Sequence, residues 1–211
     1  IGATLIISMT AMAMLFAAGT YLKQLAYFIP GAIITTSIIV YFEQNRFLRV
    51  MEYLTDPSQV HQTWQALIGI ARGGWFGTGL GGGIQKYTLL PEPQTDMIFA
   101  IIGEELGILG MLFVLLSYAY ILGKGFNIAK IALKKGRKYS SYVAFGICTW
   151  FAMQVTVNIG VNLGLLPVTG FTLPLISYGG SSLIISIISL AILLRVDMES
   201  RTNYSKQIKY V

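Results

Sequence analysis

The chain has 211 residues, of which 55% are hydrophobic and only 11% are charged, and its mean hydropathy is +0.66. Soluble domains carry about a quarter of their residues as charged side chains, so this composition excludes an ordinary water-soluble domain. Lys and Arg (15) outnumber Asp and Glu (9), which in a membrane protein first indicates topology rather than a nucleic-acid surface. We therefore expect an all-α, polytopic membrane helix bundle that forms one domain.

Five apolar segments are candidates for membrane-crossing helices, which need about 20 residues each. The last reaches that length only if a Ser-Tyr-Gly-Gly-Ser stretch inside it is buried against protein or lines a cavity. The chain opens on Ile1 without an initiator methionine, a basic segment or a cleavage site. We therefore expect a membrane helix there rather than a signal peptide, and we expect the start of the protein to be missing. The predicted transmembrane segments are residues 1–19, 24–42, 97–122, 141–163 and 175–194.

Basic residues are distributed unequally between the connections of these segments. Residues 123–140 hold six Lys or Arg and no acid, residues 195–211 hold four, and with Lys23 eleven of the 15 fall on one side. Because cytoplasmic segments carry the excess of Lys and Arg, we predict a cytoplasmic loop at 123–140, a cytoplasmic tail at 195–211 and an extracellular loop at 43–96. Topology then explains most of the net charge of +6, so we exclude nucleic acid as a partner.

The predicted extracellular loop is long, and loops of more than about 15 residues are usually functional. We expect a short amphipathic helix over residues 63–71, followed by the glycine-rich loop, residues 73–83, whose seven glycines permit sharp bends or close approach to a ligand. Residues 77–82 match the G-x-G-x-x-G pattern, but no buried strand precedes them, so we reject a dinucleotide site. His61 lacks Cys or His partners at metal-ligand spacing, so we expect no structural zinc site.

Polar residues inside the apolar segments are candidates for function. Gln154, Asn158 and Asn162 recur every fourth residue and so share one helix face. This face must contact other helices or a wet cavity, because an unpaired polar group in hydrocarbon costs several kcal/mol, and the sequence leaves the two alternatives equally open. Glu104 lies about two turns into its segment, where a carboxylate is a functional candidate unless it lies at shallow depth.

Asp96 lies where the predicted extracellular loop joins the third segment, shortly after Pro91 and Pro93, which stiffen the approach. An acid in the first turn of a helix also stabilises the helix dipole, and the residues alone favour that ordinary role. In the same loop, Arg72 and Lys86 can bind an anion such as a phosphate, or they can be plain surface charges.

Three sequence blocks are distinctive when taken together. They are Leu90-Pro-Glu-Pro-Gln-Thr-Asp96 with Phe99, Gly103-Glu-Glu-Leu-Gly107, and the block from Leu166 to Ser182, LPVTGFTLPLISYGGSS. Together they resemble the SEDS family of cell-shape and division proteins. The resemblance covers nearly the whole chain and implies the last five helices of a ten-helix fold, with the large extracellular loop before the eighth. Gln85-Lys86 and residues 194–201 are most similar to division-type members, whereas residues 166–170 are more like elongation-type members.

The resemblance implies a peptidoglycan glycosyltransferase of the bacterial plasma membrane that polymerises lipid II into glycan strands during cell division. The implied partners are a class B penicillin-binding protein and other division proteins. Asp96 corresponds to the essential aspartate of the family and Glu104 to a second sensitive acid. The residues implied to bind lipid II and undecaprenyl-linked glycan are Arg72, Lys86, Thr95, Glu104, Ser177, Gly179, Gly180 and Ser181.

The chemistry agrees with this implication. Asp96 can act as the general base of an inverting transfer, while Arg72, Lys86 or a divalent cation such as Mg²⁺ or Mn²⁺ stabilises the leaving pyrophosphate. The alternatives are a flippase or transporter of lipid-linked precursors, an elongation-type polymerase, and a non-catalytic scaffold. A transporter needs its key acid near the membrane midplane, whereas a polymerase with external substrate needs it at the outer surface, so the position of Asp96 favours the polymerase.

Overall fold

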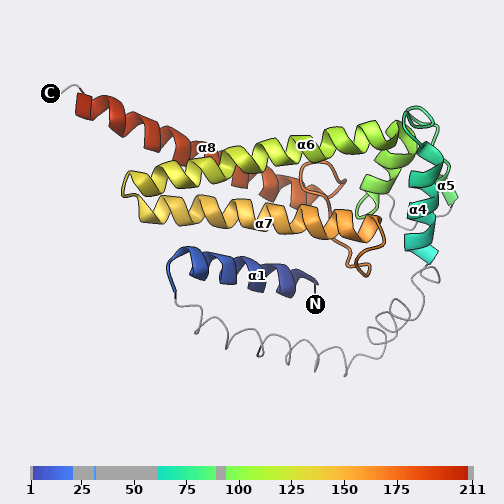
Figure 1. Cartoon of the computed structure of the whole chain (residues 1–211), viewed down its shortest axis with the longest axis horizontal. Coiled ribbons are helices and arrows are strands. Elements are labelled where there is room, and N and C mark those ends of the chain that lie inside the picture. Colours follow the sequence, from blue (N-terminus) through green and yellow to red (C-terminus); the bar gives the residue numbers. More distant parts are fainter. Residues whose placement is uncertain (1, 21–30, 32–60, 89–93, 209–211) are drawn as a thin grey trace.

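The computed structural model describes residues 2–20, 31, 61–88 and 94–208. Every regular element in this part of the chain is a helix, which confirms the predicted all-α class. Helices α6, α7 and α8 run side by side, α1 packs along α7, and α4 and α5 lie at the end of the bundle where α6 begins (Figure 1). The predicted segment 24–42 falls almost wholly outside the described residues. The helices are α1 (Gly2–Ala17), α4 (His61–Gly73), α5 (Gln85–Thr88), α6 (Ile98–Lys134), α7 (Lys138–Asn162) and α8 (Gly180–Ile208).

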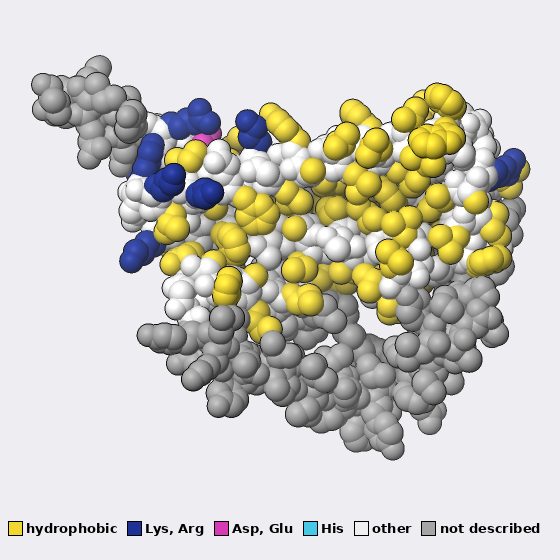
Figure 2. Space-filling model, viewed as in Figure 1, with side chains coloured by type: hydrophobic (Ala, Val, Ile, Leu, Met, Phe, Trp, Pro, Cys, Tyr) yellow, Lys and Arg dark blue, Asp and Glu magenta, His cyan; other side chains and the backbone are white. Residues whose placement is uncertain are grey.

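Three helices in the described part are long and apolar enough to cross a membrane, namely Ile98–Lys134, Lys138–Asn162 and Gly180–Thr202. A shorter apolar helix covers Ile6–Ala17. Hydrophobic side chains cover much of the visible flank of the bundle (Figure 2). Lipid is the solvent that suits such a surface, and the chain is therefore part of a multi-pass membrane protein.

The helices and the apolar segments of the sequence have different boundaries. α6 continues through residues 123–134, the first part of the predicted cytoplasmic loop, and the turn to α7 is only residues 135–137. At this turn Gly136 has a φ of 76°, the left-handed conformation in which helices commonly end. α8 begins at Gly180, five residues after the predicted start at 175, and runs through the predicted tail to Ile208. Hydropathy marks where a helix leaves the apolar layer, but Ala, Leu and Lys also favour helix in water.

Helix α6 is broken at Gly107, where φ is 68° and ψ is −165°. The backbone of the glycine-rich loop fills the break. The N–H of Thr78 donates to the carbonyl oxygen of Glu104 at 2.9 Å, and the N–H of Ile108 donates to the carbonyl oxygen of Gly74 at 2.9 Å. The loop thus supplies partners for backbone groups that lose their helical partners at the break.

This backbone-to-backbone contact requires glycine on both sides. A Cβ added to Gly73 would overlap the carbonyl oxygen of Gly103, and a Cβ added to Gly77 would overlap that of Glu105. A Cβ added to Gly107 would lie 2.5 Å from the backbone nitrogen of Gly77. Gly73 and Gly77, two of the seven glycines of this loop, are therefore required for its close packing against α6.

The loop between α7 and α8, residues 163–179, folds back onto α6; we call it the α7–α8 loop. Leu173 belongs to a buried cluster with Phe99, Met111 and Val155. The hydroxyl of Tyr118 on α6 donates to the carbonyl oxygen of Pro174. These contacts hold the α7–α8 loop beside residues 94–96, immediately before α6.

Candidate active site around Asp96

Asp96 lies two residues before the first residue of α6, and its side chain is mostly buried, with an exposure of 8%. The hydroxyl of Thr95 donates to its Oδ1 at 3.2 Å. The aspartate is therefore at the end of a helix long enough to span a membrane, where the sequence places the start of the third segment.

Two amides of α7 hold the backbone of this aspartate. The Nδ2 groups of Asn158 and Asn162 each donate to the carbonyl oxygen of Asp96 at 2.9 Å. In return, Oδ1 of Asn162 accepts the N–H of Ala100 at 3.0 Å. Asn158 and Asn162 are therefore engaged in interhelical hydrogen bonds, one of the two roles that the sequence left open. Gln154, one turn earlier and 8% exposed, has a buried Oε1 that finds no hydrogen-bond partner among the residues that the structure describes.

The α7–α8 loop holds the two preceding residues. The hydroxyl of Ser177 donates to the carbonyl oxygen of Thr95 at 2.5 Å and accepts the N–H of Leu173 at 2.6 Å. The N–H of Tyr178 donates to the carbonyl oxygen of Gln94 at 2.9 Å. Three successive carbonyl groups, those of residues 94, 95 and 96, therefore accept hydrogen bonds from α7 or from the α7–α8 loop.

The remaining residues of the Ser-Tyr-Gly-Gly-Ser stretch lie at the start of α8. A Cβ on Gly179 would lie 3.3 Å from Ser182 and 3.4 Å from Thr172, whose hydroxyls are hydrogen-bonded to each other at 2.9 Å. Gly180 and Ser181 are exposed. The stretch thus divides into a first part, the buried Ser177 and the backbone of Tyr178, which contacts residues 94 and 95, and an exposed part at the beginning of α8.

Glu104 belongs to a second group, formed with α4 and α5. Its side chain is fully buried, and its two carboxylate oxygens accept the N–H groups of Ile84 and Gln85 at 2.9 and 3.2 Å. The guanidinium of Arg72, which is 44% exposed, lies 3.7 Å from Glu104 Oε1. Glu104 therefore holds the start of α5.

Glu105, the next residue, is paired with Lys86. The ammonium group of Lys86 donates to Glu105 Oε1 at 2.5 Å. This hydrogen bond raises the pKa of Lys86 above its usual value of 10.5. The two cations proposed from the sequence thus differ, since Lys86 has a close anionic partner whereas Arg72 is more exposed and makes only a longer ion pair.

The predicted site residues therefore fall into two groups along the first part of α6. One joins Thr95, Asp96, Asn158, Asn162 and Ser177, and the other joins Arg72 and Glu104 with the neighbouring pair of Lys86 and Glu105. Tyr178, which belongs to the block from Leu166 to Ser182, takes part through a backbone hydrogen bond. The buried Tyr118, which no motif indicated, contributes a side-chain hydrogen bond to the α7–α8 loop. Within the described ranges, no three His, Cys, Asp or Glu side chains gather as a metal site.

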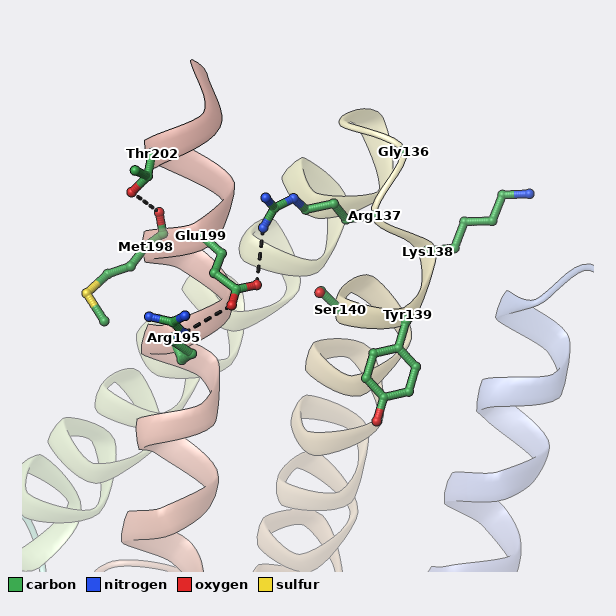
Figure 3. A pocket seen from close by; sticks show the side chains of 9 residues that line it. All are labelled: Gly136, Arg137, Lys138, Tyr139, Ser140, Arg195, Met198, Glu199 and Thr202. Atoms are coloured by element: carbon green, nitrogen blue, oxygen red, sulfur yellow. Dashed lines mark hydrogen bonds and ion pairs between the residues drawn. The ribbon is translucent and has the colours of Figure 1, made fainter. Parts of the chain in front are cut away.

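A pocket of about 910 Å³ lies at the opposite end of the bundle, between the α6–α7 turn and the last turns of α8 (Figure 3). There Glu199 accepts hydrogen bonds from Arg137 at 3.1 Å and from Arg195 at 3.0 Å. The side chain of Lys138 points away from Glu199. Basic side chains gather at this end of the molecule (Figure 2). Because the two arginines already share an anionic partner and Asp96 is at the other end, we do not assign this pocket to the reaction.

The chain is similar to known proteins over nearly its whole length. A family model described as cell cycle protein, for FtsW, RodA and SpoVE, matches residues 1–202. The chain is 44% identical over 204 residues to a probable peptidoglycan glycosyltransferase FtsW of Francisella salina, covering 95% of this chain and 51% of that protein. The protein of the same name from Legionella pneumophila is also 44% identical, over 205 residues and 52% of its length.

A solved structure described as "Structural coordination of polymerization and crosslinking by a peptidoglycan synthase complex" has a similar fold. Its TM-score is 0.71 at 27% sequence identity, and the match covers 95% of this chain and 56% of that one. The chain thus spans about half the length of the curated relatives it matches.

Proposed function

Because this chain belongs to the FtsW, RodA and SpoVE family of cell cycle proteins, the SEDS family that its sequence resembles, we propose that it is part of a peptidoglycan glycosyltransferase. The enzyme polymerises lipid II into glycan strands at the bacterial inner membrane. The observation that carries this proposal is the mostly buried Asp96, held at the end of a membrane-length helix by hydrogen bonds to residues 94–96. The names of relatives at 44% identity support the division type over the elongation type.

Asp96 is the general base in this proposal. Its carboxylate takes the proton of the acceptor sugar's 4-hydroxyl while that oxygen forms a bond to the anomeric carbon of the donor. The bond from this carbon to the donor's pyrophosphate breaks at the same time, and the lipid pyrophosphate leaves with the electron pair. Attack from the opposite face inverts the configuration. A positioned base of this kind contributes about 10²- to 10⁴-fold to a rate.

The leaving pyrophosphate requires positive charge more than it requires a proton. We assign this role to Arg72 ahead of Lys86, because the ammonium group of Lys86 is 2.5 Å from Glu105 whereas Arg72 is 44% exposed and 3.7 Å from Glu104. The exposed Gly180 and Ser181 are available to the sugar chains.

A divalent cation remains a proposal of the same kind. Since the described residues offer no cluster of three metal-ligating side chains, Mg²⁺ or Mn²⁺ would have to be held mainly by the phosphates of the substrate. We assign no step of the reaction to it.

The proposed topology places the end of the bundle with Asp96 outside and the C-terminus in the cytoplasm. The gathering of Lys and Arg at the α6–α7 turn supports this orientation, because cytoplasmic segments carry the excess of basic residues. The polyprenyl tail of lipid II stays in the bilayer, and the extended glycan passes to a class B penicillin-binding protein, the proposed transpeptidase partner in an assembly with other division proteins.

A flippase of lipid-linked precursors is the second candidate, because Glu104 and Gln154 are buried polar residues within membrane-length helices. The full-length protein, purified in detergent with lipid II, distinguishes the two candidates, since transport needs two compartments and polymerisation does not. We expect glycan strands to accumulate in detergent. If well-folded protein forms no glycan but translocates lipid II in proteoliposomes, the polymerase proposal is wrong and the protein is a flippase.

A further inference from the structure

We propose that Asn158, Asn162 and Ser177 are positioning residues of the reaction, which act by fixing the backbone of residues 94–96 and thereby the direction of the Asp96 carboxylate. This inference rests on the proposed function and adds a role for the amides of α7 and for the α7–α8 loop. None of the three needs to touch the substrate for this role. All three are buried, with exposures of 1%, 0% and 6%.

The aspartate needs such support because it precedes the helix. Helical hydrogen bonds begin with the carbonyl oxygen of Met97, which accepts the N–H groups of Ala100 and Ile101 at 3.1 and 3.3 Å. Residues 94–96 form a turn whose carbonyl oxygens accept hydrogen bonds from α7 and from the α7–α8 loop. The orientation of the Asp96 side chain therefore depends on groups that are distant in sequence.

Asn162 performs the task of an N-cap from a neighbouring helix. An N-cap side chain ordinarily accepts the N–H of the second or third helical residue, and Met97 makes no such side-chain bond. Ala100 is the third residue of α6, and its N–H donates to Asn162 Oδ1 at 3.0 Å, while Asn162 Nδ2 donates to the carbonyl oxygen of Asp96 at 2.9 Å. One side chain thus holds both sides of the junction between turn and helix.

Asn158 connects this junction to the α7–α8 loop. Its Nδ2 donates to the carbonyl oxygens of Asp96 at 2.9 Å and of Phe171 at 2.5 Å. Ser177 completes the connection, since its hydroxyl bridges the N–H of Leu173 and the carbonyl oxygen of Thr95. The α7–α8 loop is thereby connected to the turn at residues 94–96 at two points, through Asn158 at Asp96 and through Ser177 at Thr95.

A general base is sensitive to such support, because a displacement of about 1 Å of a reacting group can cost roughly 100-fold in rate. Loss of one amide leaves the other donor on the Asp96 carbonyl, whereas loss of both leaves that oxygen without either α7 donor. We therefore expect each single variant to be much milder than the double variant. Since the substrate is not contacted, the loss should appear in kcat rather than in KM.

The test is steady-state lipid II polymerisation by the full-length protein carrying Asn158→Leu, Asn162→Leu or both, substitutions that remove the amide while keeping similar volume. Thr149→Val is the matched control, because it removes a buried hydroxyl of α7 that bonds only within its own helix, to Phe145 at 2.9 Å. We expect kcat of the double variant to fall about 100-fold with KM within twofold of wild type, and the control to keep its rate.

Ser177 gives an independent comparison that does not depend on how the amide variants fold. Ser177→Ala removes the donor to Thr95, whereas Ser177→Thr retains a hydroxyl. We expect Ala to lower kcat about tenfold, after correction for the folded fraction measured by thermal unfolding, and Thr to restore much of it. A normal kcat in both the amide double variant and Ser177→Ala overturns the inference, and so does a loss that only follows the unfolded fraction. If wild type itself forms no glycan under these conditions, the proposed function is at fault instead.

Discussion

Asp96 and Glu104 are both acids near the start of α6, but their surroundings give them different tasks. The two oxygens of Glu104 accept backbone N–H groups at the start of α5, and its side chain is fully buried. In Asp96, by contrast, the backbone carbonyl oxygen accepts a hydrogen bond from Asn158 of α7. The Asp96 carboxylate contacts the Thr95 hydroxyl. The sequence predicted both acids as important. It gave no means to assign the support of α5 to Glu104, because the partners are backbone groups of residues 84 and 85.

Replacing Glu104 by Gln should lower polymerisation only in part. The amide keeps the shape and one acceptor oxygen, but its NH₂ group faces a second backbone N–H, and a buried donor without an acceptor costs about 1–3 kcal/mol. We expect a reduced melting temperature and about tenfold lower activity. The comparison is with Asp96→Asn in the same assay. An equally complete loss in Glu104→Gln at normal stability would show that Glu104 takes part in the chemistry.

The pair of Lys86 and Glu105 should make the attachment of α5 dependent on pH. Because the hydrogen bond to Glu105 raises the pKa of Lys86, its stabilisation is present in full below the usual lysine value of 10.5 and is lost as pH rises through the folded-state value. We therefore measure the melting temperatures of wild type and Lys86→Gln from pH 8 upward. The two melting temperatures should converge only at a pH above 10.5, the usual pKa of lysine. Curves that converge below pH 9 would contradict the pairing.

At the scale of elements, α6 is two helical pieces that meet at Gly107, and the glycine-rich loop packs against the break between them. The sequence predicted the apolar segment correctly as a helix but not the break at Gly107, because Gly103 and Gly107 equally fit an ordinary close-packing motif of membrane helices. The segment that packs against the break lies about thirty residues earlier in the chain, and hydropathy carries no information about such backbone pairing.

The sequence predicted the amides of α7 in a similarly incomplete way. The helical spacing of Asn158 and Asn162 predicted a shared polar face, but not the partner of that face, the carbonyl oxygen of Asp96.

Gly107→Ala should destabilise the protein, since φ of 68° is strained for alanine and the added Cβ would lie 2.5 Å from the backbone of Gly77. Backbone strain alone costs about 1–3 kcal/mol, and the overlap adds to it. Gly123→Ala is the control on the same helix, because a Cβ there meets nothing within 4 Å. We expect thermal unfolding to shift down by several degrees for the first variant and by none for the second. Equal melting temperatures would refute the packing of the glycine-rich loop against α6.

At the scale of the whole molecule, the Lys and Arg cluster at the α6–α7 turn and the candidate site lie at opposite ends of the bundle. The basic side chains gather at the α6–α7 turn, whereas α6 begins at the other end, beside α4 (Figures 1 and 2). Asp96 lies two residues before the first residue of α6. The counts of basic residues predicted this separation from the sequence, because it depends only on which connections are basic. The distribution is what an enzyme needs if it receives its sugar substrate outside the cell and is oriented by cytoplasmic charge.

Cysteine labelling should test this orientation. Leu80 in the glycine-rich loop is 82% exposed, and Lys134 at the end of α6 is also exposed, so cysteines at these positions disturb little packing. The native Cys148 is buried and gives little background. We expect an impermeant maleimide to label Leu80→Cys but not Lys134→Cys in intact cells, and to label both after permeabilisation. The opposite pattern in intact cells would invert the proposed topology.

The most direct measurement of the central claim is the rate of lipid II polymerisation by the purified full-length protein with Asp96→Asn, at a melting temperature equal to that of wild type. Asparagine retains the shape and the backbone contacts of residues 94–96 but removes the base. We predict that the rate falls by at least about 10²-fold, the usual contribution of a general base. Polymerisation at the wild-type rate would contradict the assignment of Asp96 as the base.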